Sequence, residues 1–188
     1  MRNTVLKIAA LSGSLRPESS NTAVLRALAR LAPDDVSVSI YDGMGDLPHF
    51  SPERDTDPAP SAVQTLRELL TESDAVVICT PEYAHGMPGS LKNALDWLVG
   101  SGELVGKPVA ALSASPSEDG GANARAWLVQ TLTVMSANVV PGASFGIGLV
   151  RTKFGTDGVV SDPATVAALR DVLEALRGAA FPDAIECA

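Results

Sequence analysis

The stretch Ala75-Val76-Val77-Ile78-Cys79 decides the fold, because it is a continuous apolar run with no polar residue to face solvent. A run of this kind is typical of a strand that is covered on both faces, as the strands of a parallel sheet are. Parallel strands need crossover connections, which are usually helices. The stretch therefore predicts a central parallel strand in an α/β protein.

Strand and helix patterns alternate on both sides of this stretch. Short apolar or alternating runs predict further strands at residues 5–11, 36–40, 109–112 and 138–140. Apolar residues at helical spacing predict helices at 24–31, 63–70, 91–98, 127–135 and 166–176. The helical stripe at 127–135 consists of Trp127, Leu128, Thr131, Leu132 and Met135, and Asp162 can cap the last helix. The pattern predicts a doubly wound α/β sandwich with helices on both faces of a parallel sheet.

Length and composition predict one cytoplasmic domain, residues 1–188. The chain has 188 residues, 46% of them apolar and 19% charged, which is typical of a globular domain. Its 14 Lys and Arg against 22 Asp and Glu give a net charge of −8, so we expect no nucleic-acid or membrane partner. Cys79 and Cys187 cannot build a disulfide framework, and no apolar run suits a signal peptide or a membrane helix.

The loop after the first predicted strand has the composition of an anion site. Residues 12–22 read Ser-Gly-Ser-Leu-Arg-Pro-Glu-Ser-Ser-Asn-Thr and lead into a helix, whose free amides and dipole favour a phosphate. Further contacts can come from Ser14, Arg16, Ser19, Asn21 and Thr22. A plain helix cap beside a solvated Arg16 is the alternative. The G-x-G-x-x-G and Walker patterns do not occur here, which disfavours an NAD-type Rossmann domain and a P-loop NTPase.

A second loop, residues 81–89, follows the central strand. Its sequence Pro-Glu-Tyr-Ala-His-Gly-Met-Pro-Gly fixes an irregular backbone beside the first loop. Backbone amides there can bond the polar rim of a flat ligand, and Tyr83 and Met87 offer apolar contact. An ordinary turn with Tyr83 packed in the core is the alternative.

Two motifs together resemble the NADPH-dependent FMN reductase family. The first is Gly13-Ser14-Leu15-Arg16 with Ser19 and Asn21, and the second is Pro81-Glu82-Tyr83 with Pro88-Gly89 and Leu91-Lys92-Asn93-Ala94-Leu95-Asp96-Trp97. The resemblance runs from about Val5 to about Ser115. It implies a flavodoxin-like three-layer sandwich, with five parallel strands in the order 2-1-3-4-5. It also implies bound FMN, with NADPH or NADH as co-substrate.

The resemblance assigns the cofactor contacts to three loops. It places the FMN phosphate at Ser14, Arg16, Ser19, Asn21 and Thr22, and the flavin ring at Pro81, Glu82, Tyr83, Ala84, His85 and Gly86. Many family members have Asn where this chain has Ala84, so only a backbone contact is expected there. The loop after the fourth strand resembles a third contact, with Ser115, Gly120 and Gly121 as candidates. A solvated turn suits the Ser, Gly and Asp residues of that loop equally well.

The implied activity is hydride transfer from a nicotinamide through N5 of FMN to a second substrate. The cofactor carries this chemistry, so we expect no catalytic side chain and no metal ligands. We expect a ping-pong mechanism whose acceptor is a quinone, a free flavin, an azo compound or a metal oxyanion. The alternative is a flavodoxin-type FMN electron carrier without nicotinamide chemistry, which the acidic charge suits. A flavin-free binder of sugar phosphates or nucleotides would leave the second motif unexplained.

The family usually assembles as dimers or tetramers, so the resemblance also implies a homodimer or homotetramer. Candidate contacts are Trp97, Leu98 and residues 42–60. The segment 42–60 is rich in Pro and has no sustained apolar period, which predicts a long loop with a functional or interface role. Burial of Trp97 in the core is the alternative.

Overall fold

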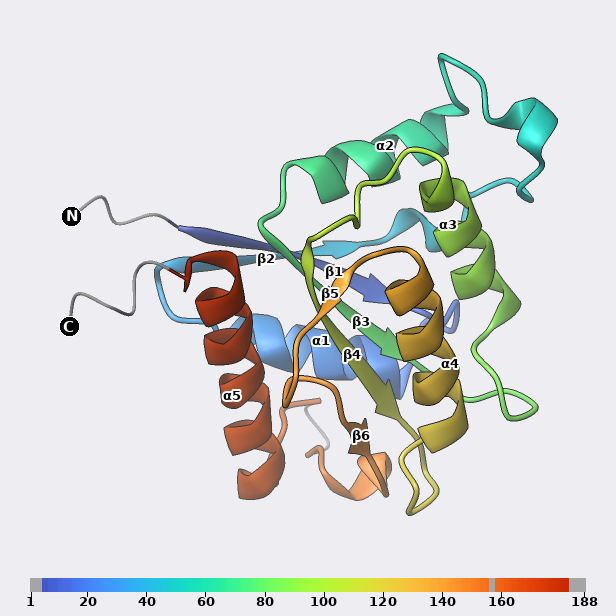
Figure 1. Ribbon diagram of the computed structural model, residues 1–188. Helices are drawn as coiled ribbons and strands as arrows, with labels where there is room; N and C mark the ends of the chain where they lie inside the picture. The colour runs from blue at the N-terminus through green and yellow to red at the C-terminus, as the bar shows by residue number, and fades with distance from the viewer. Residues whose placement is uncertain (1–4, 156–157, 183–188) are drawn as a thin grey trace.

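A parallel sheet forms the centre of the computed structural model, which describes residues 5–155 and 158–182 (Figure 1). Its strands are β1 (Leu6–Ser12), β2 (Val36–Tyr41), β3 (Ala75–Thr80), β4 (Pro108–Ala114), β5 (Asn138–Val139) and β6 (Gly146–Ile147). Their order is β2-β1-β3-β4-β5, with β6 also paired to β4. The predicted flavodoxin-like order is confirmed. All residues of β3 are buried, as the central apolar run predicted.

The fifth position of the sheet is filled by an interrupted strand. β5 pairs with the start of β4, at Pro108 and Val109, whereas β6 pairs with its end, at Ser113 and Ala114. Between them the chain leaves the sheet, and Ser144 Oγ accepts the hydrogen bond of the Ala111 amide at 3.0 Å. The predicted strand near 138–140 is confirmed, but β6 is an addition to the five strands expected.

Five α-helices of the described residues cover the two faces of the sheet. They are α1 (Ser20–Leu31), α2 (Ser61–Thr71), α3 (Gly89–Val99), α4 (Ala122–Val134) and α5 (Pro163–Ala180). α1 and α5 pack on one face, and α2, α3 and α4 pack on the other (Figure 1). Asp162 caps α5 as expected, since its side chain accepts from the Thr165 amide at 2.9 Å.

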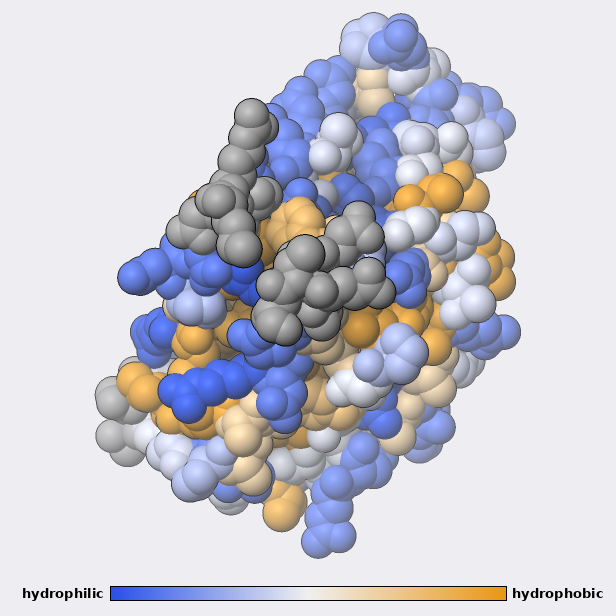
Figure 2. Space-filling view, turned by 60° about the vertical axis from the view of Figure 1, so that its left-hand side comes forward, coloured by the Kyte–Doolittle hydropathy of each residue, from blue (hydrophilic) through white to orange (hydrophobic). Residues whose placement is uncertain are grey.

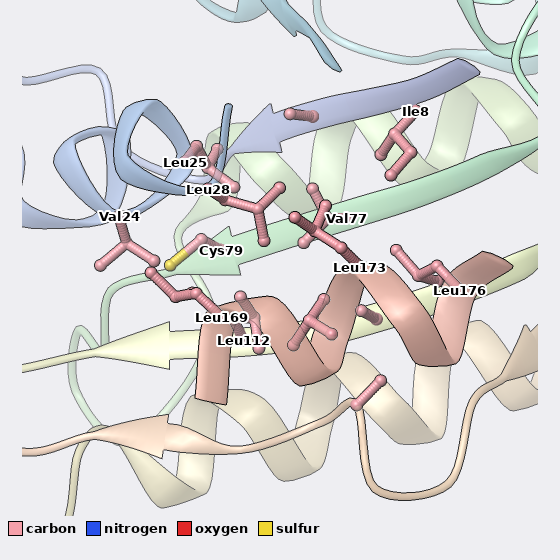
Figure 3. Packing of buried hydrophobic residues seen from close by; sticks show 14 of the residues in the cluster. Ile8, Val24, Leu25, Leu28, Val77, Cys79, Leu112, Leu169, Leu173 and Leu176 are labelled. Carbon is pink, nitrogen blue, oxygen red and sulfur yellow. The ribbon is translucent and has the colours of Figure 1, made fainter. Parts of the chain in front are cut away.

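The face under α1 and α5 is packed with aliphatic side chains. Leu28 of α1 and Leu173 of α5 point toward Val77 of β3 (Figure 3). Cys79, at the end of the same strand, belongs to this cluster and is fully buried, whereas Cys187 lies outside the described residues. Burying a leucine side chain contributes about 1.5–3 kcal/mol, so these contacts fix the position of α1 and of the loop that precedes it.

Trp97 and Leu98 belong to the core under α3, which corrects their assignment as candidate surface contacts. Their exposed fractions are 0% and 1%. The indole N–H of Trp97 donates to Pro48 O at 2.8 Å, and its ring meets Phe50 edge-on with centroids 5.1 Å apart. Asn93 also donates to Pro48 O. The segment 42–60 is therefore pinned onto α3 by these contacts.

The buried stripe of α4 differs from the predicted one. Leu128, Leu132 and Met135 are buried, but Trp127 is 58% exposed and Thr131 only half-buried. Residues 127 and 128 are neighbours on the helix, so burial of Leu128 turns Trp127 toward solvent.

Hydrophilic and hydrophobic residues both occur on the outer surface. On the side of α5, hydrophilic and hydrophobic residues are interspersed (Figure 2). Among the described helices, none has the length and apolar character needed to cross a membrane.

Candidate active site at the carboxyl ends of the strands

The first loop follows β1 and packs tightly against the end of β3. The Gly13 amide donates to Cys79 O at 2.9 Å. A Cβ on Gly13 would lie 3.1 Å from both Thr80 Oγ1 and Leu91 Cδ2, so any larger residue would have to displace these neighbours. Because β1 and β3 are adjacent and parallel, this contact places the first loop beside the second.

The start of α1 presents free backbone donors. Ser19 is the helix cap, and its Oγ accepts from the amides of Asn21 at 3.2 Å and Thr22 at 3.4 Å. Within the described part of the chain, the amides of Leu15, Ser19 and Ser20 donate no hydrogen bond. Free amides at the positive end of a helix form an anion site. Ser19 therefore caps α1 and still has a hydroxyl proton for a ligand.

The side chains of Asn21 and Thr22 bond to the framework of the protein. Asn21 is 3% exposed; its Nδ2 donates to Ala114 O at 3.1 Å, and its Oδ1 accepts from the Ala114 amide at 3.0 Å. The same oxygen accepts from the thiol of Cys79 at 3.1 Å, and burial raises the pKa of that thiol. Thr22 Oγ1 lies 2.8 Å from Ser12 Oγ. Both residues tie α1 to the ends of neighbouring strands.

The second loop ends in a tight hairpin with unusual backbone angles. Tyr83 and Gly86 exchange both backbone hydrogen bonds at 3.0 Å. The two residues between them, Ala84 and His85, have φ of 49° and 60°, as a type I′ turn requires. Left-handed backbone costs roughly 1–2 kcal/mol for residues other than glycine, and such strain concentrates at functional sites. Tyr83 is 52% exposed, so the alternative prediction, in which Tyr83 packs in the core, is wrong.

Glu82 anchors this hairpin to the start of α4. Its Oε2 accepts from the Ala124 amide at 3.1 Å, and its Oε1 accepts from Asn123 Nδ2 at 3.2 Å. His85 Nδ1 also lies 3.2 Å from Oε1. Partial burial pushes the pKa of Glu82 upward, but the hydrogen bonds from Ala124 and Asn123 prevail and hold the pKa below its usual value. The carboxylate therefore stays charged near neutral pH, where it also favours the helix N-terminus.

The third loop, Ser115–Gly121, is pressed against β6. The Ser115 amide donates to Ile147 O at 3.1 Å, and Ser113 Oγ donates to Gly120 O at 2.6 Å. Gly120 has φ of +64°, and a Cβ there would lie 2.8 Å from the carbonyl carbon of Gly146. Gly121, with φ of +79°, is the cap residue of α4. Glycine is required at Gly120, because a Cβ would collide with the backbone of β6, and the positive φ favours glycine at Gly121.

The three loops border a single cavity of about 100 Å³. Most of the predicted contacts line it, namely Ser14, Arg16, Ser19 and Asn21 of the first loop, Pro81, Glu82 and Tyr83 of the second, and Ser115 of the third. The remaining candidates do not: Thr22 lines a neighbouring cavity, Ala84, His85 and Gly86 form the hairpin tip, and Gly120 and Gly121 lie further along the third loop. The sequence thus located three loops that meet in space.

Arg151 is a functional candidate that the sequence did not reveal. It lies in the 3-10 turn η3 (Val150–Thr152) after β6, is exposed, and lines the same cavity as Arg16. Within the described residues neither guanidinium has a hydrogen-bond or ion-pair partner through its side chain. Nothing in the local sequence marks Arg151, since only the pairing of β6 with β4 brings it to the site. Two unpaired cations at one cavity favour an anionic ligand.

The comparison with known families identifies the chain. Residues 6–151 match the family described as NADPH-dependent FMN reductase. This chain belongs to the NADPH-dependent FMN reductase family. As a member, the protein is an oxidoreductase that uses FMN and NAD(P)H, as the two motifs indicated. The family favours this activity over that of a flavodoxin-type electron carrier.

Relatives match this chain over most of their length, and a solved structure shares its fold. The chain is 35% identical over 174 residues to a quinone reductase of Escherichia coli, which covers 90% of this chain and 93% of that protein. It is 33% identical over 174 residues to an NAD(P)H-dependent FMN reductase of Pseudomonas aeruginosa, with 92% and 94% covered. The structure superposes on a flavoenzyme NAD(P)H:(acceptor) oxidoreductase from Paracoccus denitrificans with a TM-score of 0.80, 30% identity, and 95% and 98% covered.

The cavity of the FMN reductase has the groups that an FMN phosphate needs. Free amides at the start of α1 and the unpaired guanidiniums of Arg16 and Arg151 supply donors and positive charge. Gly13 and Gly120 allow the loops to approach closely where a Cβ would collide. The exposed Tyr83 offers a flat apolar surface next to them. The residues present therefore fit the cofactor of the family.

Proposed function

We propose that this FMN reductase passes a hydride from NADPH or NADH through FMN to a quinone in a ping-pong cycle. The observation that carries the proposal is the three-loop cavity with two unpaired guanidiniums at the carboxyl ends of the strands. Several similar proteins are named for quinones. One of them is the 2-hydroxy-1,4-benzoquinone reductase of Burkholderia sp, which is 41% identical over 126 residues and covers 65% of this chain and 68% of that protein. Free flavins, azo compounds and metal oxyanions are the other candidate acceptors.

The first loop and η3 would hold the FMN phosphate. The amides of Leu15, Ser19 and Ser20 donate to it, and Arg16 and Arg151 supply positive charge. The hydroxyls of Ser14 and Ser19 can add donors, because their hydrogen bonds to backbone amides use only oxygen lone pairs. Asn21 and Thr22 act through the position of α1, since their side chains are bonded to the framework.

The second and third loops would hold the flavin ring. When bound, FMN accepts and returns a hydride at N5. Pro81 to Gly86 supply backbone groups and the exposed ring of Tyr83, and Glu82 fixes the hairpin against α4. Ser115, Gly120 and Gly121 approach from the neighbouring strand, β4. The exposed tip at His85, whose side chain is 85% exposed, leaves room for the two substrates to use one open site in turn.

Anaerobic titration of the FMN-loaded protein tests this function. NADPH or NADH should bleach the visible flavin absorbance, and a benzoquinone should restore it without a third component. Steady-state double-reciprocal lines should then be parallel. Intersecting lines would contradict the ping-pong order. A flavin that binds but is reduced by neither nucleotide would favour the electron carrier, and failure to bind FMN would refute the site itself.

Arg151→Gln tests the residue assignment. Loss of one charge-assisted contact to phosphate should raise the dissociation constant of FMN about tenfold, measured by quenching of free FMN fluorescence. Arg170→Gln is the matched control, because Arg170 is an exposed arginine of α5 that does not line the cavity. If both variants bind FMN as the natural protein does, Arg151 does not contact the phosphate.

We also propose that the protein is a cytoplasmic homodimer or homotetramer. On α4, Trp127 is 58% and Val134 81% exposed, and the two lie on one side of the helix, seven positions apart. A Cβ on Gly86 would lie 3.4 Å from the Trp127 ring, so an interface there would adjoin the flavin hairpin. The buried free thiol of Cys79 suits a reducing compartment. Light scattering at micromolar concentration tests the assembly, and a monomer mass would refute it.

A further inference from the structure

The exposed aromatic residues of the protein gather at the second loop. The chain has four Phe, two Trp and two Tyr, all of them among the described residues. Of these, Tyr83 and Trp127 are 52% and 58% exposed, and the others are buried or half-buried. Tyr83 belongs to the hairpin and Trp127 to α4, so two distant segments of the chain bring these rings together. Exposed aromatic side chains that cluster in this way mark a binding surface.

Trp127 is held against the hairpin. A Cβ on Gly86 would lie 3.4 Å from Trp127 Cζ3 and 3.5 Å from Trp127 Cε3, so the indole packs on the backbone of Gly86. Asn123, one turn earlier on the same side of α4, donates to Glu82 Oε1 at 3.2 Å. This side of α4 therefore contacts the hairpin twice, which fixes the indole beside it.

Tyr83 and Trp127 border the same face of the hairpin. Tyr83 and Gly86 exchange both backbone hydrogen bonds, so they are directly opposite each other. Opposite residues of an antiparallel pair present their side chains on one face. Gly86 has no side chain, and the Trp127 indole packs beside the place where one would begin. The phenol and the indole are thus neighbours on one surface.

This aromatic surface begins at the cofactor cavity and extends away from it. Tyr83 lines the three-loop cavity, whereas Trp127 does not. The residues that fit FMN therefore do not include Trp127. A substrate that reaches the flavin across the hairpin would pass over the indole, and a flat ring would gain most from this contact.

We propose that Trp127 determines the specificity of the acceptor site by stacking on the planar ring of a quinone. This rests on the proposed function, in which FMN occupies the three-loop cavity. Stacking requires an aromatic or quinonoid ring, so Trp127 favours acceptors with such a ring over metal oxyanions.

Steady-state assays of the FMN-loaded protein test the proposal with tetramethyl-1,4-benzoquinone, which has no free ring position for a thiol to attack. Trp127→Leu should raise the KM for this quinone about tenfold and leave kcat unchanged. Trp127→Phe keeps an aromatic ring, so its KM should stay within about threefold of the natural value. The KM for ferricyanide, an acceptor without a ring, and the dissociation constant of FMN should be the same in all three proteins.

Val134→Ser is the matched control, because it separates stacking from assembly. Val134 is 81% exposed on the same side of α4, seven positions after Trp127. If Trp127 acted only by contacting a second copy of the chain, both variants would raise the KM for the quinone. Stacking on the indole predicts that Val134→Ser leaves this KM unchanged.

Fluorescence of the oxidised, FMN-loaded protein measures quinone binding without turnover. Trp97 is 0% exposed, so an added quinone meets only the indole of Trp127 directly. Quenching should saturate as the quinone concentration rises, because the quinone occupies a site. Quenching that rises linearly would show collisions alone.

Three results would overturn the proposal: an unchanged quinone KM in Trp127→Leu, an equal rise in Val134→Ser, or linear quenching. Each leaves the proposed function intact, as long as NADPH or NADH bleaches the flavin and the quinone restores it. Failure of both nucleotides to bleach the flavin would refute the proposed function instead, and the quenching titration would still decide whether a quinone binds at Trp127.

Discussion

The first loop bonds its side chains to the protein, whereas the second loop holds a strained backbone. Ser19 Oγ caps α1, Asn21 bonds the end of β4, and Ser12 Oγ pairs with Thr22 Oγ1. In the second loop, Ala84 and His85 adopt left-handed backbone, which the Tyr83–Gly86 hydrogen bonds and the Glu82 anchor maintain. Both loops border the same cavity.

This difference indicates two separate ways to prepare a binding site. The first loop is part of the framework, so its free amides are held by the interactions that hold the fold. The second loop is fixed by a few contacts at its base, and the backbone at its tip is strained. Substitutions in the first loop should therefore act on stability, and substitutions in the second should act on the local conformation of the hairpin.

The largest expected effect comes from Asn21→Ala. It leaves the amide and carbonyl of Ala114 without partners in the interior, and leaves the Cys79 thiol without its acceptor. An unpaired buried group costs about 1–3 kcal/mol, so we expect a loss of roughly 3 kcal/mol in the free energy of unfolding. Urea denaturation followed by circular dichroism measures it.

Asn123→Ala is the control for Asn21→Ala. It removes an exposed asparagine whose side chain donates to Glu82 of the second loop. Its expected loss is below about 1 kcal/mol, because water replaces the lost partner. Similar losses in the two variants would show that the first loop is no more integral to the fold than the second.

A smaller, pH-dependent effect is expected from Glu82→Gln. The natural carboxylate has a pKa held below its usual value of 4.5, so the stability it contributes is complete above that pH. The contribution disappears as the pH falls through the lowered pKa of the folded state. The free energy of unfolding of the natural protein should exceed that of Glu82→Gln by about 1 kcal/mol at pH 7. This difference should disappear below pH 4 or so.

The comparison of natural protein and Glu82→Gln isolates this group. Asp162 also has a lowered pKa, from hydrogen bonds by Thr165, but it titrates in both proteins and cancels in the difference. Unfolding free energies at several pH values between 3 and 7 or so provide the measurement. A gap that stays constant down to the acid end would mean that the charge of Glu82 does not anchor the hairpin.

The sequence predicted what depends on long patterns and local chemistry. The apolar run at β3 and the helical spacing of Leu169, Leu173 and Leu176 are such patterns, and both are confirmed. β6 has two residues, too few to show a period, and it pairs with β4 through backbone bonds to Phe145 and Ile147 carbonyls. The residues next to Arg151 in the sequence do not indicate a role at the cavity, because only the pairing of β6 with β4 brings Arg151 there.

Other differences arise where one residue has two roles. Composition offered Ser19 as either a cap or a ligand donor, and the structure shows the cap while leaving the hydroxyl proton free. Trp127 shared a helical stripe with Leu128, yet only one of two adjacent residues can face the sheet. Such choices depend on packing partners that are distant in the sequence.

The smallest expected effect is a gain in stability from Ala84→Asn. Ala84 has φ of 49°, a conformation that asparagine adopts at lower cost than alanine, so the variant should unfold with about 0.5–1 kcal/mol more free energy. Ala126→Asn is the matched control, because Ala126 is exposed within α4 and asparagine lowers helix propensity there by about 0.5 kcal/mol. Opposite signs for the two variants would locate backbone strain in the second loop, and a loss in both would show that the hairpin is not left-handed in solution.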